Sequence, residues 1–146
     1  GIELDPTIFE MHYNLAVAYT QDEDYLNAIE EFKKVISMKP EHAISYYSYA
    51  SAQNNLAKDI KDKKIRLNEK NKLYKVETSE NEETQPQEQP ELTDKEKKLV
   101  VEYYNSAIAN YEKFLELKPD AEEKSEAESQ IQNIKQTLEA DASGEQ

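Results

Sequence analysis

Cysteine and tryptophan are absent from this chain of 146 residues, and glycine occurs only twice. The lack of cysteine excludes disulfide bonds, thiolate metal sites and cysteine nucleophiles. Two glycines and five prolines offer few of the turns that a β-sheet protein needs, whereas residues that favour helices, such as alanine, leucine, glutamate and lysine, are frequent. The composition therefore predicts an all-α fold, as one domain or a short helical array.

Long apolar runs and an excess of positive charge are also missing. The longest apolar run, residues 15–19, is far shorter than the roughly 18 to 20 residues that cross a bilayer. The formal net charge of −13 repels phosphate backbones and anionic lipid surfaces. We therefore expect a soluble chain with protein partners, no nucleic acid, no membrane insertion and no cofactor. The compartment stays open, with the cytoplasm favoured over the periplasm.

An internal repeat organises the chain. Pro6 and Pro40 are 34 residues apart, and each ends a similar five-residue tail, at residues 2–6 and 36–40. A third tail of the same kind ends at Pro119. A period of this length indicates a stack of similar structural units rather than one closed core.

The unit between the first two prolines resembles the tetratricopeptide repeat, whose pattern runs Trp, Leu-Gly, Tyr, Ala, Phe and Pro. Five positions match: Leu15, Tyr19, Ala28, Phe32 and Pro40. His12 stands where the family has Trp, and Ala16 stands where it has Gly. The resemblance implies an α-solenoid, a stack of antiparallel helix pairs that binds other proteins and performs no chemistry.

The spacing of apolar residues indicates two amphipathic helices in this unit without reference to any family. Leu15, Ala18 and Tyr19 form one helical stripe, and residues 28–36 carry another at three-to-four spacing. An aspartate in the polar turn at 21–24 can cap the second helix. Because the turn is short, the two helices must run antiparallel.

A second unit follows, but it is interrupted. First-helix positions of the repeat are filled by Tyr46, Tyr49, Ala50 and Gln53, and second-helix positions by Ala107, Tyr111 and Pro119. About 45 residues are therefore inserted, at about 58–100. We expect one helix over 42–67 and a returning helix over 94–117 that begins with a capping box at Thr93 and Glu96. The two helices are expected to protrude as a hairpin.

The inserted segment separates charge. Residues 58–75 carry eight basic and three acidic side chains, whereas residues 77–94 carry seven acidic and no basic ones. Because residues 76–92 hold almost no apolar side chain, burial cannot offset the entropy of ordering them, and we expect disorder there. The basic arm is either a solvated helix face neutralised by the acidic arm, which we favour, or a binding patch for an acidic partner or RNA.

Candidate chemistry is sparse. His12 and His42 lie in different parts of the repeat, without the spacing of metal ligands, and are expected to serve as a packing residue and a surface residue. The acidic run at 22–24 lacks the glycine and the terminal glutamate of a calcium loop. Glu30 and Glu31 are expected to face solvent rather than a pocket. We therefore expect no enzyme, no catalytic residue and no metal site.

The C-terminal residues suit a cap for the stack. Residues 120–123 have the sequence of a capping box, and one narrow apolar stripe follows on an otherwise polar helix. We expect that helix over 121–140. The predicted divisions are 1–7 as the tail of a truncated preceding repeat, 8–41 as the first complete repeat, 42–119 as the second repeat with its insertion, and 120–146 as the capping helix and a frayed tail.

The resemblance also implies where a partner binds, on the concave face made by the first helices of the repeats. The residues implied are Tyr13, Asn14, Val17, Thr20, Tyr47, Ser48, Ser51 and Asn55, and Glu10, Gln21 and Ile44 lie beside them. Asn14 matches the asparagine with which the family holds the backbone of a bound peptide. Because none of these residues is basic, a clamp for a chaperone's terminal carboxylate is not expected. A competing interpretation is that the tyrosines only cover the core.

Two further hypotheses stand beside peptide binding. The array begins within a repeat, so an uncovered apolar end predicts self-association with another subunit or stacking on a missing upstream repeat. Alternatively, the chain is the non-catalytic part of a larger enzyme. Sedimentation at several concentrations separates self-association from the other two.

Overall fold

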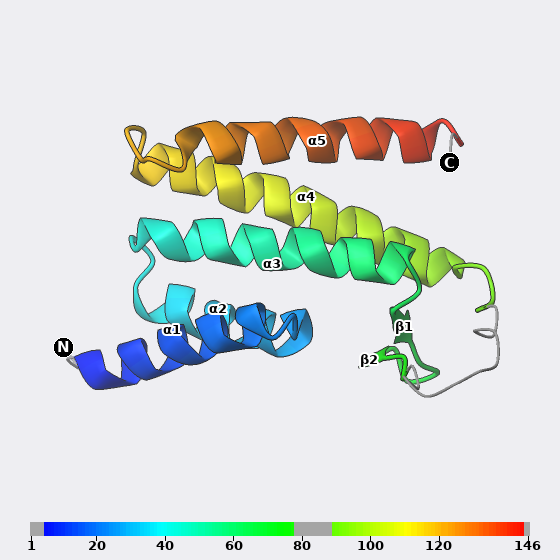
Figure 1. Cartoon of the computed structure of the whole chain (residues 1–146), viewed down its shortest axis with the longest axis horizontal. Coiled ribbons are helices and arrows are strands. Elements are labelled where there is room, and N and C mark those ends of the chain that lie inside the picture. Colours follow the sequence, from blue (N-terminus) through cyan, green and yellow to red (C-terminus); the bar gives the residue numbers. More distant parts are fainter. Residues whose placement is uncertain (1–4, 78–88, 145–146) are drawn as a thin grey trace.

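The computed structural model describes residues 5–77 and 89–144 and folds them into five α-helices and one two-stranded antiparallel sheet (Figure 1). In chain order the elements are α1 (Pro6–Gln21), α2 (Tyr25–Met38), α3 (Ala43–Lys61), β1 (Ile65–Leu67), β2 (Leu73–Lys75), α4 (Asp94–Leu117) and α5 (Lys124–Ala142). The predicted class, an all-α helical repeat, is confirmed, because helices hold most of the chain.

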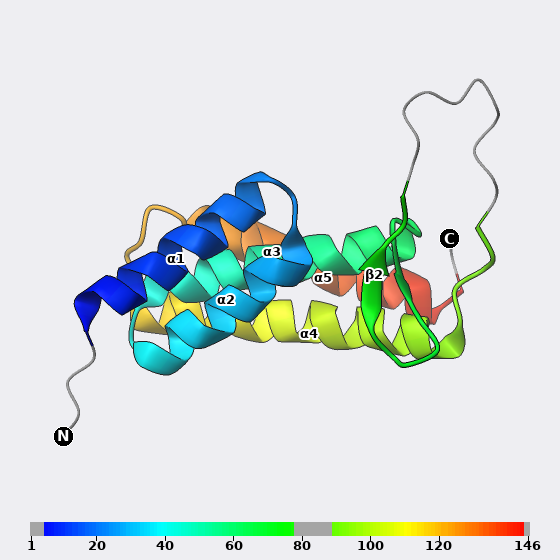
Figure 2. The same ribbon diagram turned by 90° about the horizontal axis from the view of Figure 1, so that it is seen from below.

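The helices pack in layers, each against the next one along the chain. α1 packs on α2, α2 on α3, α3 on α4, and α4 on α5. Figure 1 shows α5 and α4 above α3, with α1 and α2 below it. Seen from below, α1 and α2 cover only one half of the longer α3 and α4 (Figure 2). The small sheet lies beside the other half.

The hydrophobic core runs along α2, α3 and α4. Ala28, Phe32 and Val35 of α2 are fully buried, as their three-to-four spacing predicts. On α4 the buried side chains at helical spacing are Val100, Tyr104, Ala107, Tyr111 and Phe114. The apolar stripe predicted over residues 28–36 is therefore confirmed in α2, and α4 buries a stripe of the same kind.

Local capping signals set the starts of α2 and α4. Asp24 caps α2, and its carboxylate accepts from the backbone N–H of Asn27 at 3.3 Å. At the start of α4, the Thr93 hydroxyl accepts from the Glu96 N–H at 3.1 Å, and the Glu96 carboxylate accepts from the Thr93 N–H at 2.9 Å. The capping box predicted there is confirmed. Such a box satisfies two backbone donors that the helix leaves free.

The starts of α1 and α5 differ from expectation. Asp5 caps α1, and Pro6 is the first residue of the helix. Residues 1–4 lie outside the described residues, so their assignment to a preceding repeat stays a prediction. The capping box expected at 120–123 is wrong, because α5 begins at Lys124 and its N-cap residue makes no side-chain capping bond.

One side of α1 is more exposed than its apolar stripe suggests. Leu15 is 37% exposed and Ala18 is exposed, and of the predicted stripe only Tyr19 packs against the core. The buried residues of α1 are instead Phe9 and Ala16. The reason is that α1 packs on α2 and only lightly on α3, so no other described helix covers the side that carries Leu15.

Glu31 is buried, and the expectation that it faces solvent is wrong. Its side chain is 11% exposed, with one carboxylate oxygen 2.6 Å from Nδ1 of His12 and the other 3.3 Å from Nζ of Lys34. His12 is on α1 and Glu31 on α2, so the pair joins the two helices. A partner 19 residues away leaves no local signal that sequence spacing could reveal.

The largest departure from prediction follows α3. The helix ends at Lys61, and Lys63 has a φ of 64°, which turns the chain away from the helix axis. Two strands then pair, with Ile65 opposite Lys75, Arg66 opposite Tyr74, and Leu67 opposite Leu73. The predictions of one helix over 42–67 and of a chain without strands are therefore wrong.

Two asparagines form the turn between the strands. The side-chain oxygen Oδ1 of Asn68 accepts from the backbone N–H groups of Lys70 and Lys72 at 2.9 and 3.0 Å, and Asn71 has a φ of 61°. Asparagine favours such turns because its short amide bonds the nearby backbone and tolerates the left-handed region. These residues are the local signal against a continuous helix.

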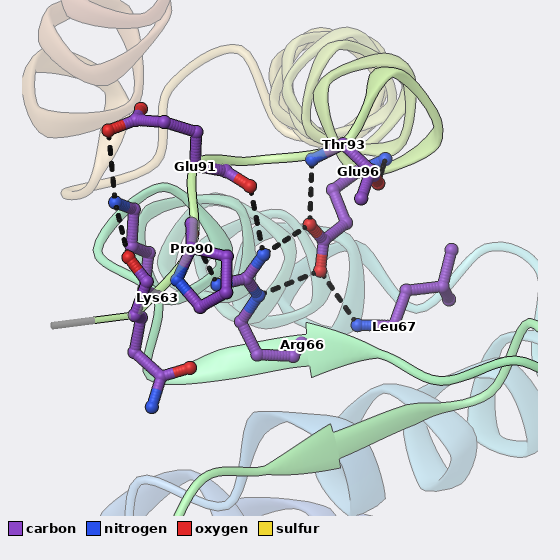
Figure 3. Close-up of polar contacts among 8 residues, drawn as sticks. Lys63, Arg66, Leu67, Pro90, Glu91, Thr93 and Glu96 are labelled. Atoms are coloured by element: carbon purple, nitrogen blue, oxygen red, sulfur yellow. Dashed lines mark hydrogen bonds and ion pairs between the residues drawn. The ribbon is translucent and has the colours of Figure 1, made fainter. Parts of the chain in front are cut away.

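A buried ion pair fastens the sheet to the start of α4 (Figure 3). Arg66 donates to both carboxylate oxygens of Glu96, at 3.0 and 2.8 Å. The same guanidinium donates to the backbone carbonyls of Pro90 and Glu91 at 2.8 and 3.2 Å, and the Leu67 N–H donates to Glu96 at 2.9 Å. Three of these five hydrogen bonds join the sheet to Glu96 of α4, and the other two join it to the segment just before the helix.

The disorder predicted over 76–92 concerns mainly residues 78–88, which lie outside the described residues. At the described end, Nζ of Lys63 is 3.6 Å from the Glu91 carboxylate and 3.3 Å from the Gln89 carbonyl oxygen. The basic and acidic arms therefore contact each other here, as the charge separation suggested.

Candidate protein-binding surfaces

The predicted residues on α1 differ in how free they are to contact a partner. Tyr13 is half-buried, and its ring packs 6.2 Å from that of Phe9 and 5.6 Å from that of His42, centre to centre. Val17 is half-buried, and the Thr20 hydroxyl donates to the Ala16 carbonyl at 2.8 Å. Asn14 is exposed.

His42 joins the start of α3 to this part of α1. It is the N-cap residue of α3, and its ring also lies 5.1 Å from that of Phe9 in an edge-on arrangement. Burial lowers the pKa of His42, and nearby Lys39 lowers it further. A neutral ring suits this packing, because aromatic edges and faces attract without requiring charge. The prediction of a mere surface residue at His42 is therefore wrong.

The predicted residues on α3 fall into two groups. Ser48, Ser51 and Asn55 are half-exposed and follow one another at three-to-four spacing, so they share one face of the helix. Tyr47 instead packs edge-on against Tyr111 at 5.6 Å and is tilted against Phe114 at 5.1 Å, both on α4. For Tyr47 the packing interpretation is thus the better one.

Carboxylates lie near this part of α3. Burial raises the pKa of the Tyr47 hydroxyl, and the neighbouring Glu126 and Glu123 raise it further. On α1 the exposed Glu10 lies one helical turn before Asn14. A polar face with acidic neighbours favours neutral or basic segments over acidic ones.

The remaining candidate groups do not build a reactive site. His12 and Glu31 are close, but they bridge α1 and α2 beside Lys34 rather than line a cavity. Within residues 5–77 and 89–144, no group of three or more histidine, aspartate or glutamate side chains is placed to hold a metal ion.

A groove that the sequence did not indicate opens on another side of the molecule. It has a volume of about 1160 Å³ and lies between the α1–α2 turn and the β-sheet, along the half of α3 that α1 and α2 do not cover. Of the predicted site residues, only Asn55 lines it. Sequence reasoning missed the groove because its far wall is the sheet, whose first strand was expected to be the end of a helix and whose second strand was not predicted.

Comparison with known families gives one match. Residues 9–42 match the family model described as the tetratricopeptide repeat. The matched segment starts within α1 and ends at His42, the N-cap residue of α3, so it spans one complete helix pair. No curated protein matches the chain. None of the helices in the described ranges has the length and apolar character needed to cross a membrane.

Proposed function

We propose that this chain, whose residues 9–42 match the tetratricopeptide repeat, is a protein-binding module that holds a peptide or helix of a partner across the face shared by α1 and α3. Repeats of this family generally mediate protein–protein interactions and are typically not catalytic. The proposal adds a location and a binding mode to that general role.

The exposed side chain of Asn14 is the observation that carries this proposal. Asn14 is exposed on α1 next to the half-buried Tyr13, so its amide can bond a peptide backbone from outside. On the neighbouring first helix, Ser48, Ser51 and Asn55 offer further hydroxyl and amide groups. Such groups adapt to the backbone of different segments, as in binding surfaces rich in serine and asparagine.

The roles within the site follow from packing. Tyr13 and Tyr47 hold the binding face in place, because each ring packs against other aromatic rings of the fold. Val17 supplies apolar contact area, and Thr20 bonds its own helix. The partner segment is expected to be neutral or basic, because Glu10 lies one turn before Asn14 on α1 and Glu123 and Glu126 lie near Tyr47.

Calorimetry with a partner obtained by pull-down tests the proposal. Asn14→Ala is compared with Asn105→Ala, the same substitution at an exposed position of α4. Loss of affinity in the first variant alone supports binding at α1 and α3. Equal affinity of both variants and the unaltered chain moves the site elsewhere.

A second candidate function is self-association through α1. Ile8, Met11 and Leu15 lie on one side of this helix and are 46%, 55% and 37% exposed. An apolar stripe of this kind on an otherwise acidic chain marks a contact surface. Sedimentation velocity over a range of concentrations checks this: a dimer that Met11→Glu abolishes and Val101→Glu, an exposed apolar position on α4, leaves intact supports self-association. A monomer at every concentration excludes it.

A further inference from the structure

We infer that the groove between the α1–α2 turn and the β-sheet is a second peptide-binding site, separate from the face of α1 and α3. Its ligand is a segment of another protein with apolar side chains placed between a basic and an acidic residue. The inference rests on the two walls of the groove, its floor and the distribution of its charges.

The sheet forms one wall, and its alternation divides its side chains between two roles. Ile65, Leu67, Leu73 and Lys75 share the face toward the groove, where all four line it. Arg66 points to the opposite side, where it is 6% exposed and bonded to Glu96. The ion pair therefore holds the wall in place from behind, which keeps the groove formed in the absence of a ligand.

Part of the floor of the groove is apolar. Ile29 and Leu56 are 2% and 1% exposed, while Leu26, Leu99 and Tyr103 are half-exposed and offer apolar surface that a ligand can contact. Polar residues of α3 line the groove beside them, namely Asn55, Lys58 and Asp59. Small-molecule sites usually have volumes of roughly 300 to 1000 Å³. At about 1160 Å³ and open to solvent at the acidic turn, this groove fits a peptide segment better than a small molecule.

Charges of opposite sign stand on the two sides of this floor. Asp22 and Glu23 belong to the α1–α2 turn, whereas Lys75 belongs to β2 and Lys72 directly precedes that strand, and all four line the groove. None of these four groups forms an ion pair with another described residue. A peptide with a basic residue at the turn and an acidic residue at the sheet would pair with both walls.

Asp59 lies on α3 between the two walls, and the pKa of its carboxyl responds to charges on both of them. Burial raises its pKa, nearby Lys64 lowers it, and Asp62 and Glu23 raise it. The carboxylate thus lies within reach of charges from both sides of the groove. Six carboxylates against four lysines along the lining disfavour a polyanion such as RNA as the occupant.

Selection from a phage-displayed library of random 12-residue peptides tests the inference on the intact chain. Recovered peptides are synthesised, and their affinities are measured by fluorescence anisotropy. The groove variant is Lys72→Glu with Lys75→Glu, and its matched control is Lys118→Glu with Lys135→Glu, which changes the net charge equally at exposed positions outside the groove. Asn14→Ala serves as a second control that separates this groove from the proposed face of α1 and α3.

The expected result is a class of peptides that carry apolar residues between a basic and an acidic one. Their Kd rises about tenfold or more in the groove variant and stays within about twofold in both controls. Glu23→Lys, at the opposite wall, weakens the same peptides. Circular dichroism confirms that each variant is folded, and Lys75→Gln replaces the double variant if it is not.

Four outcomes overturn the inference. One is recovery of no peptide, or only of peptides whose affinity the groove variant leaves unchanged. Another is a set of peptides with charges of one sign only. The third is sensitivity of all peptides to Asn14→Ala, which would assign them to the face of α1 and α3 and leave the proposed function standing. Self-association that the groove variant abolishes would make a second copy the occupant and equally reject a peptide ligand.

Discussion

Arg66 and Glu96 form a two-point ion pair across 30 residues of sequence, with both side chains almost completely buried. The guanidinium comes from β1, and the carboxylate is the third residue of α4 and part of its capping box. One carboxylate therefore serves a helix start and a strand at once. Loss of this carboxylate should therefore destabilise both the start of α4 and β1.

We predict that Glu96→Ala lowers the free energy of unfolding by about 3 to 5 kcal/mol, because it leaves the buried Arg66 charge without its partner. Urea denaturation followed by circular dichroism measures this. The control is Glu91→Ala, whose side chain is 94% exposed beside Lys63 and which should cost at most about 1 kcal/mol. Equal losses in the two variants would show that the buried pair is not a main support of the fold.

Acidification should destabilise the fold through the same carboxylate. The hydrogen bonds from Arg66 lower the pKa of Glu96 to about 2, against an ordinary value of 4.5. Because the folded state binds this proton less readily than the unfolded state, the stabilisation is complete above the ordinary pKa and is lost as the pH falls through about 2.

The measurement is the free energy of unfolding of the unaltered chain and of Glu96→Gln between pH 7 and pH 2. The difference between the two should shrink as the pH falls below about 4, by an amount on the order of 3 kcal/mol in total. The comparison cancels the titration of the many other carboxylates. A difference that stays constant over this range would contradict the prediction.

Leu15 and Leu56 allow the same substitution at two very different sites. Leu56 is 1% exposed, so Leu56→Ala leaves a cavity and should cost about 2 to 5 kcal/mol. Leu15 is 37% exposed beside open solvent, so Leu15→Ala leaves no closed cavity and should cost about 1 kcal/mol. Chemical denaturation measures the free energy of unfolding of both variants and tests this difference. A large loss at Leu15 would mean that another chain covers α1 in solution.

Asn14→Ala should separate binding from stability. The side chain is exposed on α1, so the free energy of unfolding should change by about 0.5 kcal/mol or less. The affinity for a partner held by this amide should fall by roughly 1 to 3 kcal/mol, about fivefold or more. Tyr47→Ala is a poorer probe, because Tyr47 packs on Tyr111 and Phe114 and its loss would also weaken the fold.

Replacement of residues 78–88 by a Gly-Ser segment of equal length should leave the thermal midpoint within about 2 °C of that of the unaltered chain. The reason is that the bonds from Arg66 to Pro90 and Glu91 and the capping box at Thr93 all lie outside the replaced residues. Differential scanning calorimetry provides the comparison. A large drop would show that the replaced segment contributes to the fold.

Local signals predicted the helices well, since each depends on residues only a few positions apart. Residue types and their spacing along the chain were enough to predict the cap at Asp24, the capping box at Thr93 and the buried positions of α2. The same reasoning failed after Lys61, where apolar residues at helical spacing outweighed the turn signals at Asn68 and Asn71. A few neighbouring residues cannot decide between a longer helix and a β-hairpin, because the hairpin is held by the contact of Arg66 with Glu96, 30 residues further along the chain.

The sequence by itself determined the repeat class, the helix pairs and the polar character of the face around Asn14, because periodicity and capping act within one or two helical turns. Only the tertiary structure decided that Glu31 is buried against His12, that Leu15 stays exposed and that a sheet closes one side of a groove. Each of these depends on which distant segment lies alongside. The pairing of Arg66 with Glu96 shows the physical reason: removing either charge from water is costly unless the other lies beside it, and only the folded chain brings the two together.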